Sequence, residues 1–140
     1  MKTTELAGAV CALILTACAT QTAAHKEILP LAGSEWGTNI DGQFIRFDEP
    51  GRVSNGAEIQ GWVMGNGGCN RFRGEYSLRG SALYISPLMS TKMACSKLPQ
   101  EQEFFALLAK TKQAEITHLS LVLKDEAGNI LATLKRQDWD

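Results

Sequence analysis

Polar and apolar residues alternate most regularly over residues 71–79. One phase of this segment is apolar or small, at Phe72, Gly74, Tyr76 and Leu78. A period of two residues is typical of a strand with one buried face and one solvated face. The pair Gly80-Ser81 suits a turn, and residues 82–85 offer a partner strand, so the pattern predicts a β-hairpin.

The same alternation recurs in shorter segments on both sides of this hairpin. Apolar residues within 44–47 and the pattern over 58–64 predict two earlier strands. Residues 119–123 and 130–134 alternate around a polar turn, which predicts a second hairpin. The apolar side chains expected on its inner face are Leu119, Leu121, Leu123, Ile130, Ala132 and Leu134.

Residues 99–111 have a helical period instead. Pro99 suits the first turn, where its missing N–H is not needed, and Glu101 and Glu103 match the positive end of the helix dipole. The stripe expected to pack on the sheet is Phe104, Phe105, Leu107, Leu108 and Thr111. The alternative is a helix whose apolar stripe binds a partner.

Short strands with one main helix predict an α+β fold, mostly antiparallel β, with a curled or open barrel-like sheet. Curling would hide the edges of the strands, which otherwise invite aggregation. The chain has 140 residues, and we expect one domain over residues 31–137, with Trp36 as its first large apolar anchor.

The N-terminal region follows a different pattern. An apolar stretch over residues 6–15 leads into the sequence L-T-A-C, which ends at Cys18 and matches a bacterial lipobox. The stretch is shorter than the about 20 residues needed to span a bilayer. We therefore expect residues 1–17 to be a lipoprotein signal peptide, Cys18 to be lipidated, and residues 18–30 to be a flexible tether.

The alternative is an ordinary signal that is cleaved after Ala19 or Ala23, with Cys18 incidental. If Cys18 carries lipid, the residue after it is alanine and not aspartate, which favours the outer membrane. The expected location is therefore the cell envelope, anchored by lipid and facing the periplasm.

Four cysteines occur in the chain. Cys11 lies in the predicted signal and Cys18 at the lipidation point, which leaves Cys69 and Cys95. In an oxidising compartment a disulfide between these two is expected. A metal site and a redox pair are weaker alternatives, because the spacing fits neither a closed zinc site nor C-x-x-C.

The formal net charge is −1, so the chain has no overall basic field and we expect no nucleic-acid partner. A local excess of positive charge lies on the polar phase of the first hairpin, at Arg71, Arg73 and Arg79. These residues form a candidate binding face for anionic headgroups or an acidic partner. The alternative is an ordinary solvated strand face.

Two motifs together carry a family resemblance: G-G-C-N-R-F-R-G-E-Y over residues 67–76 and S-T-K-M-A-C over residues 90–95. They resemble the META domain family, to which the heat-shock protein HslJ belongs. The acidic helix and the final leucine-rich hairpin follow in the order of the family, so the resemblance covers residues 31–136. Lys92 stands where the family usually has arginine.

The resemblance implies a compact, mostly antiparallel β domain with one helix, often on lipoproteins, and no established catalytic activity. We therefore expect a non-enzymatic binding or stress-protective module with no cofactor and an unknown periplasmic protein partner. The alternative is a carrier that holds a small apolar ligand, such as a lipid tail, in its curled sheet. A hydrolase is a distant third.

Structural roles are expected for the motif residues. Gly68 permits an unusual backbone conformation in the bend over residues 65–68, and Asn70 caps loose backbone groups. Thr91 bonds backbone in the loop that carries the second cysteine, and Met93 fills a gap in the core. An anion-binding loop is the alternative for the bend, but the spacing of a phosphate loop is missing. A nucleophilic Thr91 lacks a base near it in the sequence.

Overall fold

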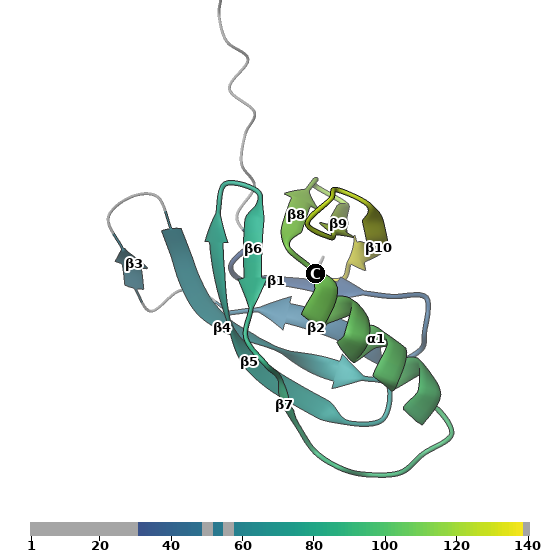
Figure 1. Cartoon of the computed structure of the whole chain (residues 1–140). Coiled ribbons are helices and arrows are strands. Elements are labelled where there is room, and N and C mark those ends of the chain that lie inside the picture. The colour runs from purple at the N-terminus through teal and green to yellow at the C-terminus, as the bar shows by residue number, and fades with distance from the viewer. Residues whose placement is uncertain (1–30, 49–51, 55–57, 139–140) are drawn as a thin grey trace, which may run out of the picture.

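The computed structural model describes residues 31–48, 52–54 and 58–138, so the predicted signal peptide and tether lie outside the described residues (Figure 1). The elements in chain order are β1 (Ser34–Gly37), β2 (Gln43–Phe47), β3 (Arg52–Ser54), β4 (Glu58–Gly67), β5 (Arg71–Arg79), β6 (Ala82–Ile85), β7 (Met89–Ser90), α1 (Leu98–Lys110), β8 (Gln113–Ile116), β9 (Ser120–Lys124) and β10 (Ile130–Arg136).

Eight antiparallel strands close into a barrel in the order β4-β2-β1-β10-β9-β8-β6-β5, and β5 pairs back with β4. The narrowest junction joins β6 to β8, where Ala82 pairs with Gln113. The short strands β3 and β7 add to β4 and β5 outside this ring. The predicted α+β fold with a barrel-like sheet is confirmed. The prediction allowed a curled or open sheet, and the sheet of the structure closes through the pairing of β4 with β5.

Apolar side chains fill the interior of the barrel. A barrel of eight strands is narrow enough for inward-facing side chains to occupy its interior. Every strand of the ring contributes buried side chains. The largest fully buried side chains of the barrel interior are Trp36, Tyr76, Phe47, Leu31, Ile45, Leu83, Leu121, Leu123, Leu134 and Val63. They belong to one continuous cluster, so the interior is a packed core.

Tyr76 is the clearest case of a buried aromatic with a satisfied polar end. Its ring meets that of Phe47 edge to face, with 5.0 Å between the ring centroids, and its hydroxyl donates to the Asp48 carbonyl at 3.2 Å. Burial, together with the negative charge of Asp48, raises the pKa of Tyr76 to about 12. The inward phase predicted for this strand is therefore confirmed.

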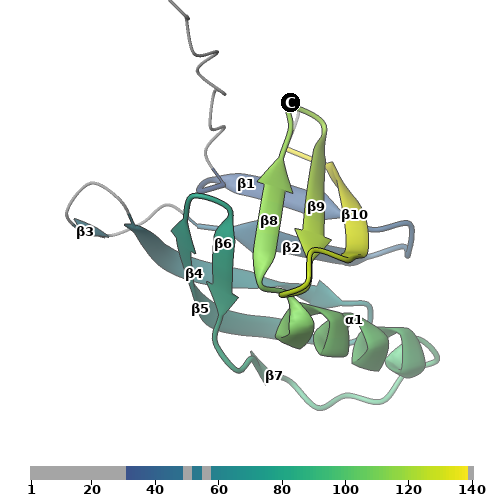
Figure 2. The ribbon, with the colours of Figure 1, turned by 45° about the horizontal axis from the view of Figure 1, so that its top comes forward.

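The helix α1 lies across one end of the barrel, below the lower ends of β8, β9 and β10 in Figure 2. Phe104 and Leu108 are buried in the core, and the ring of Phe72 contacts Phe104 and Phe105 edge to face. The helix begins and ends one residue before the predicted range, and its predicted packing on the sheet is confirmed. Within the described residues, no helix is long and apolar enough to cross a membrane.

Two residues of the C-terminal hairpin differ from the prediction. Leu119 lies in the connection between β8 and β9 and is 64 % exposed. Ile130 is 65 % exposed. The pairing of β10 with β9 shifts register between Ile130 and Ala132, which reverses the phase of the strand. Leu121, Leu123 and Leu134 lie inside, as predicted.

The glycine-rich segment before Cys69 also differs from the prediction. Of the expected bend over residues 65–68, residues 65–67 form the end of β4, which pairs with β2 and β5, and only Gly68 lies in the turn. The turn is later and tighter, and is closed by a hydrogen bond from the Gly67 N–H to the Asn70 carbonyl. The long β4 strand therefore holds the first motif in the barrel wall.

Candidate functional site

The two sequence motifs meet at Asn70, which is 2 % exposed. Its Oδ1 accepts hydrogen bonds from the Met93 N–H at 2.6 Å and the Thr91 hydroxyl at 2.8 Å. Its Nδ2 donates to the Met93 carbonyl at 3.0 Å and to Glu101 Oε1 at 2.7 Å. One amide thus joins the β4–β5 turn, the loop after β7 and the helix, which is the capping role predicted for it.

Glu101 is the second centre of this cluster and is 3 % exposed. Its Oε2 accepts hydrogen bonds from the backbone N–H groups of Cys69, at 3.0 Å, and Asn70. A Cβ on Gly67 would lie 2.6 Å from Glu101 Cγ, and Gly68 has a φ of 113°. Glycine at both positions therefore lets the turn receive the carboxylate at close range.

A disulfide joins Cys69 to Cys95, as the sequence predicted, with 5.9 Å between the two Cα atoms. The bond links the same two segments that the Asn70 amide links. We call Cys69, Asn70, Thr91, Cys95 and Glu101 the motif cluster. Its cross-links hold the loop between β7 and α1 against the turn between β4 and β5.

Two details of this cluster correct the sequence analysis. Met93 is 61 % exposed, and it is the backbone of Met93, not its side chain, that meets the cluster. The Thr91 hydroxyl donates to the Asn70 side chain where a backbone partner was expected. Both differences arise because the loop runs along the outside of the barrel, where Asn70 reaches it from within.

Every polar group in the motif cluster has a structural partner. The oxygens of Glu101 accept three hydrogen bonds, and the Thr91 hydroxyl is committed to Asn70. Over residues 31–48, 52–54 and 58–138, no three His, Cys, Asp or Glu side chains come together to hold a metal ion. The arrangement suits cross-linking of the fold rather than acid–base or nucleophilic chemistry.

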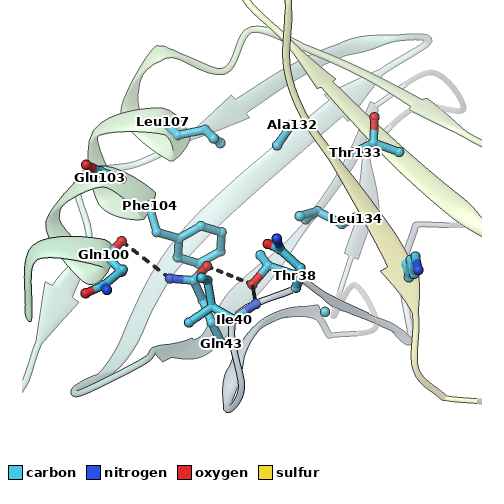
Figure 3. Close-up of a pocket in the computed structure, with 13 residues that line it drawn as sticks. Thr38, Ile40, Gln43, Gln100, Glu103, Phe104, Leu107, Ala132, Thr133 and Leu134 are labelled. Atoms are coloured by element: carbon cyan, nitrogen blue, oxygen red, sulfur yellow. Dashed lines mark hydrogen bonds between the residues drawn. The ribbon is translucent and has the colours of Figure 1, made fainter. Parts of the chain in front are cut away.

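An open groove of about 510 Å³ runs beside this cluster, between α1, β10 and the loop that joins β1 to β2 (Figure 3). Gln43 lies at its edge and donates to the carbonyls of Gly67, at 2.8 Å, and Gln100, at 3.4 Å. Its Oε1 accepts a hydrogen bond from the Thr38 hydroxyl at 2.8 Å. The apolar residues that line the groove are Ile40, Phe104, Leu107, Ala132 and Leu134.

The structure divides the basic face predicted from the sequence. Arg71, Arg73 and Arg79 are all exposed on the outer side of β5. Arg79 lies six residues beyond Arg73, which is about 20 Å along the strand. The Arg79 guanidinium lies 3.2 Å from Glu58 Oε2. The hydrogen bond from Arg79 holds the pKa of the Glu58 carboxyl below its usual range. Arg79 therefore does not act together with the other two.

Arg46, which the charge pattern along the sequence did not single out, lies close to Arg73 instead. Arg46 lies opposite Met64 on β4, and Met64 lies opposite Arg73 on β5, so the three side chains share one row of the outer surface. Arg46 also forms an ion pair with Asp48, with 3.6 Å between Arg46 Nε and Asp48 Oδ1. Together with Arg71, these arginines surround a hollow of about 560 Å³, and we call Arg46, Arg71 and Arg73 the outer basic face. The signal that could have revealed Arg46 is its place as the single polar residue within 44–47.

The closed barrel, the helix across its end and the motif cluster define a small β-barrel domain whose turn, loop and helix are cross-linked by side chains. The chain belongs to the META domain family, whose family model matches residues 30–138.

An NMR structure of a protein from Burkholderia xenovorans is similar to this chain, with a TM-score of 0.52 and 21% sequence identity. The alignment covers 78% of this chain and 85% of that chain. At this level of identity the likeness shows a shared fold alone. No curated protein matches the chain.

Proposed function

We propose that this protein is a lipid-anchored component of the bacterial cell envelope. Its META domain binds a partner and catalyses no reaction. The L-T-A-C sequence supports the anchor at Cys18, which lies outside the described residues. A signal of this kind would leave the folded domain on a tether, facing the periplasm at the outer membrane. The binding would protect the cell during envelope stress.

The observation that carries the binding role is the filled interior of the barrel. Large side chains from all parts of the ring pack into one buried cluster. A carrier of the lipocalin kind needs room inside its barrel for the ligand. This barrel is packed, which favours recognition on the outer surface over the alternative of an internal lipid carrier.

The hydrolase alternative is also disfavoured by the motif cluster. A nucleophile needs a base within hydrogen-bond reach, and the base needs a group that orients it. Thr91 donates instead to an amide oxygen, and Glu101 is engaged by two backbone N–H groups and an amide. The cluster therefore supports a structural role for the motifs.

The anchor is tested by mass spectrometry of the mature N-terminus, isolated from cells that make the full chain. We expect a chain that begins at Cys18 and carries a diacylglycerol on its sulfur and an acyl chain on its amine. Cys18→Ala should abolish that modification and move the protein from the membrane fraction to the soluble fraction. A mature chain that begins after Ala19 or Ala23, or an unmodified Cys18, would contradict the proposal.

The outer basic face is tested by reversing two of its charges. In the chain from Ala19 onward, Arg71→Glu with Arg73→Glu should weaken binding to phosphatidylglycerol vesicles at low salt by about tenfold or more, because each basic residue near an anionic surface contributes about 1 kcal/mol. Salt should weaken the wild-type binding in the same direction. The measurement is cosedimentation with vesicles over a salt series.

The matched control reverses two exposed lysines elsewhere, Lys112→Glu with Lys135→Glu, which changes the net charge by the same amount. Both double variants should unfold near the temperature of the wild type, because exposed charges contribute little to stability. Equal loss of binding in the two variants would show that net charge, and not this face, is responsible.

A further inference from the structure

A second hollow lies on the outer surface over β4, β5 and β6, with a volume of about 540 Å³. Two of the exposed large side chains of the protein flank it: Trp62 is 38 % exposed and Tyr84 is 53 % exposed. The polar side chains that line the hollow between them are Gln60, Glu75 and Ser77. None of these residues belongs to the motif cluster or to the outer basic face.

The strand register explains how these side chains come together. Trp62 lies opposite Glu75, and Ser77 lies opposite both Gln60 on one side and Tyr84 on the other. The two aromatic residues therefore stand on the strands either side of β5, two residues apart along the strand direction. Standard sheet spacings put their Cα atoms about 12 Å apart. This separation exceeds one pyranose ring, so each aromatic ring would meet a different sugar residue of a chain.

Trp62 is held in place although it is exposed. The guanidinium of Arg73 lies over its ring, 3.8 Å from the centroid. A cation on one side of an indole restrains the ring, while the side that lines the hollow is available to a ligand. A fixed aromatic platform loses less conformational freedom when a ligand binds than a mobile one does.

We propose that this hollow binds an uncharged oligosaccharide. A pyranose ring has an apolar face of C–H groups, which the electron-rich face of an aromatic ring attracts, and a rim of hydroxyl groups. Carboxylate, amide and hydroxyl side chains accept and donate hydrogen bonds to such a rim. Glu75 between the two aromatic residues would repel an anionic ligand, and the wide separation of the two rings suits a chain of sugar rings better than a single small cation.

The test uses chitotetraose and cellotetraose as probes, added to the isotope-labelled chain from Ala19 onward and followed by NMR. We expect the indole N–H signal of Trp62 to shift with at least one probe, together with backbone signals of β4, β5 and β6. Trp36 provides an internal reference, because it is fully buried and its indole N–H donates to Ser34 at 2.7 Å.

Trp62→Ala and Tyr84→Ala should each weaken binding by about tenfold, because each removes one stacking surface. Leu119→Ala removes a more exposed apolar side chain from another part of the surface and should leave the affinity unchanged. Thermal unfolding shows whether each variant is folded. If Trp62→Ala is destabilised, the Tyr84→Ala variant still tests the site.

Either of two results would overturn the proposal: no shift with either probe up to the limit of its solubility, or shifts that persist with the same affinity in both aromatic variants. Because Arg73 also restrains the Trp62 ring, the sugar site is judged from the Trp62 and Tyr84 variants, which keep every charge of the outer basic face. The two sites can therefore fail or succeed separately.

Discussion

Glu101→Ala should lower the free energy of unfolding by about 3–5 kcal/mol, because it leaves buried donors without an acceptor. The wild-type carboxylate receives the backbone N–H groups of Cys69 and Asn70 and the side-chain amide of Asn70. All of these donors lie in or beside a turn that the helix covers. Denaturant unfolding followed by fluorescence measures the difference.

Glu103→Ala is the matched control, because Glu103 is exposed on the same helix and its loss should cost no more than about 0.5 kcal/mol. Glu101→Gln should fall between the two, since it keeps one oxygen acceptor and turns the other into a donor. Equal stability of the two alanine variants would show that water replaces the carboxylate.

A double-mutant cycle with Asn70→Ala separates the pair from its surroundings. The Nδ2 of Asn70 donates to Glu101, so the two substitutions remove one shared hydrogen bond. We expect the double variant to cost less than the sum of the single variants. Strict additivity would mean that the hydrogen bond between them contributes nothing to folding.

The sequence predicted the elements with strong local patterns. The β5–β6 hairpin alternates over nine residues, and the helix has a stripe with a Pro near its start, so both stood out from their own residues. Four strands of four residues or fewer were not predicted: β1, β3, β7 and β8. Such short segments carry too few periods for alternation to be recognised.

Closure of the barrel could not be predicted in this way, because it depends on pairings between distant segments. Trp36 on β1 pairs with Arg136 on β10, a hundred residues later in the chain. The phase of Ile130 was wrong for a related reason: the register shift in β10 is a property of the pair of strands and not of one sequence.

The role of Glu101 was missed because an acidic residue in the first turn of a helix already has a sufficient explanation. Its charge favours the helix dipole whether or not it is buried. The signal that could have revealed it lies elsewhere in the chain, in a Gly67 that admits no side chain beside Glu101. Only the fold brings that glycine and the helix together.

The two parts of the basic face show the same limit at the surface. Alternation placed Arg71, Arg73 and Arg79 on one side of a strand, which the structure confirms. Their neighbours across the sheet decide what each can do, and these come from other strands. Arg79 forms an ion pair with Glu58. Arg46 on β2 lies in the same cross-strand row as Arg73.

Reduction of the Cys69–Cys95 disulfide should lower the free energy of unfolding by about 3.5 kcal/mol, the chain-entropy value for a loop of this length. The two cysteines are 26 residues apart in the sequence. Cys69→Ala and Cys95→Ala should each give a similar loss, and the double variant should cost little more, because both single variants break the same bond. Denaturant unfolding with and without a reductant measures these differences.

The reduced protein should nevertheless remain folded at room temperature, because the Asn70 amide joins the same two segments through hydrogen bonds to Thr91 and Met93. Asn70→Ala should therefore make the protein far more sensitive to reductant than the wild type is. Peptide mapping without reductant provides the control for the bond itself. Two free thiols in the oxidised protein, or a wild type whose stability does not change on reduction, would contradict a stabilising disulfide at this position.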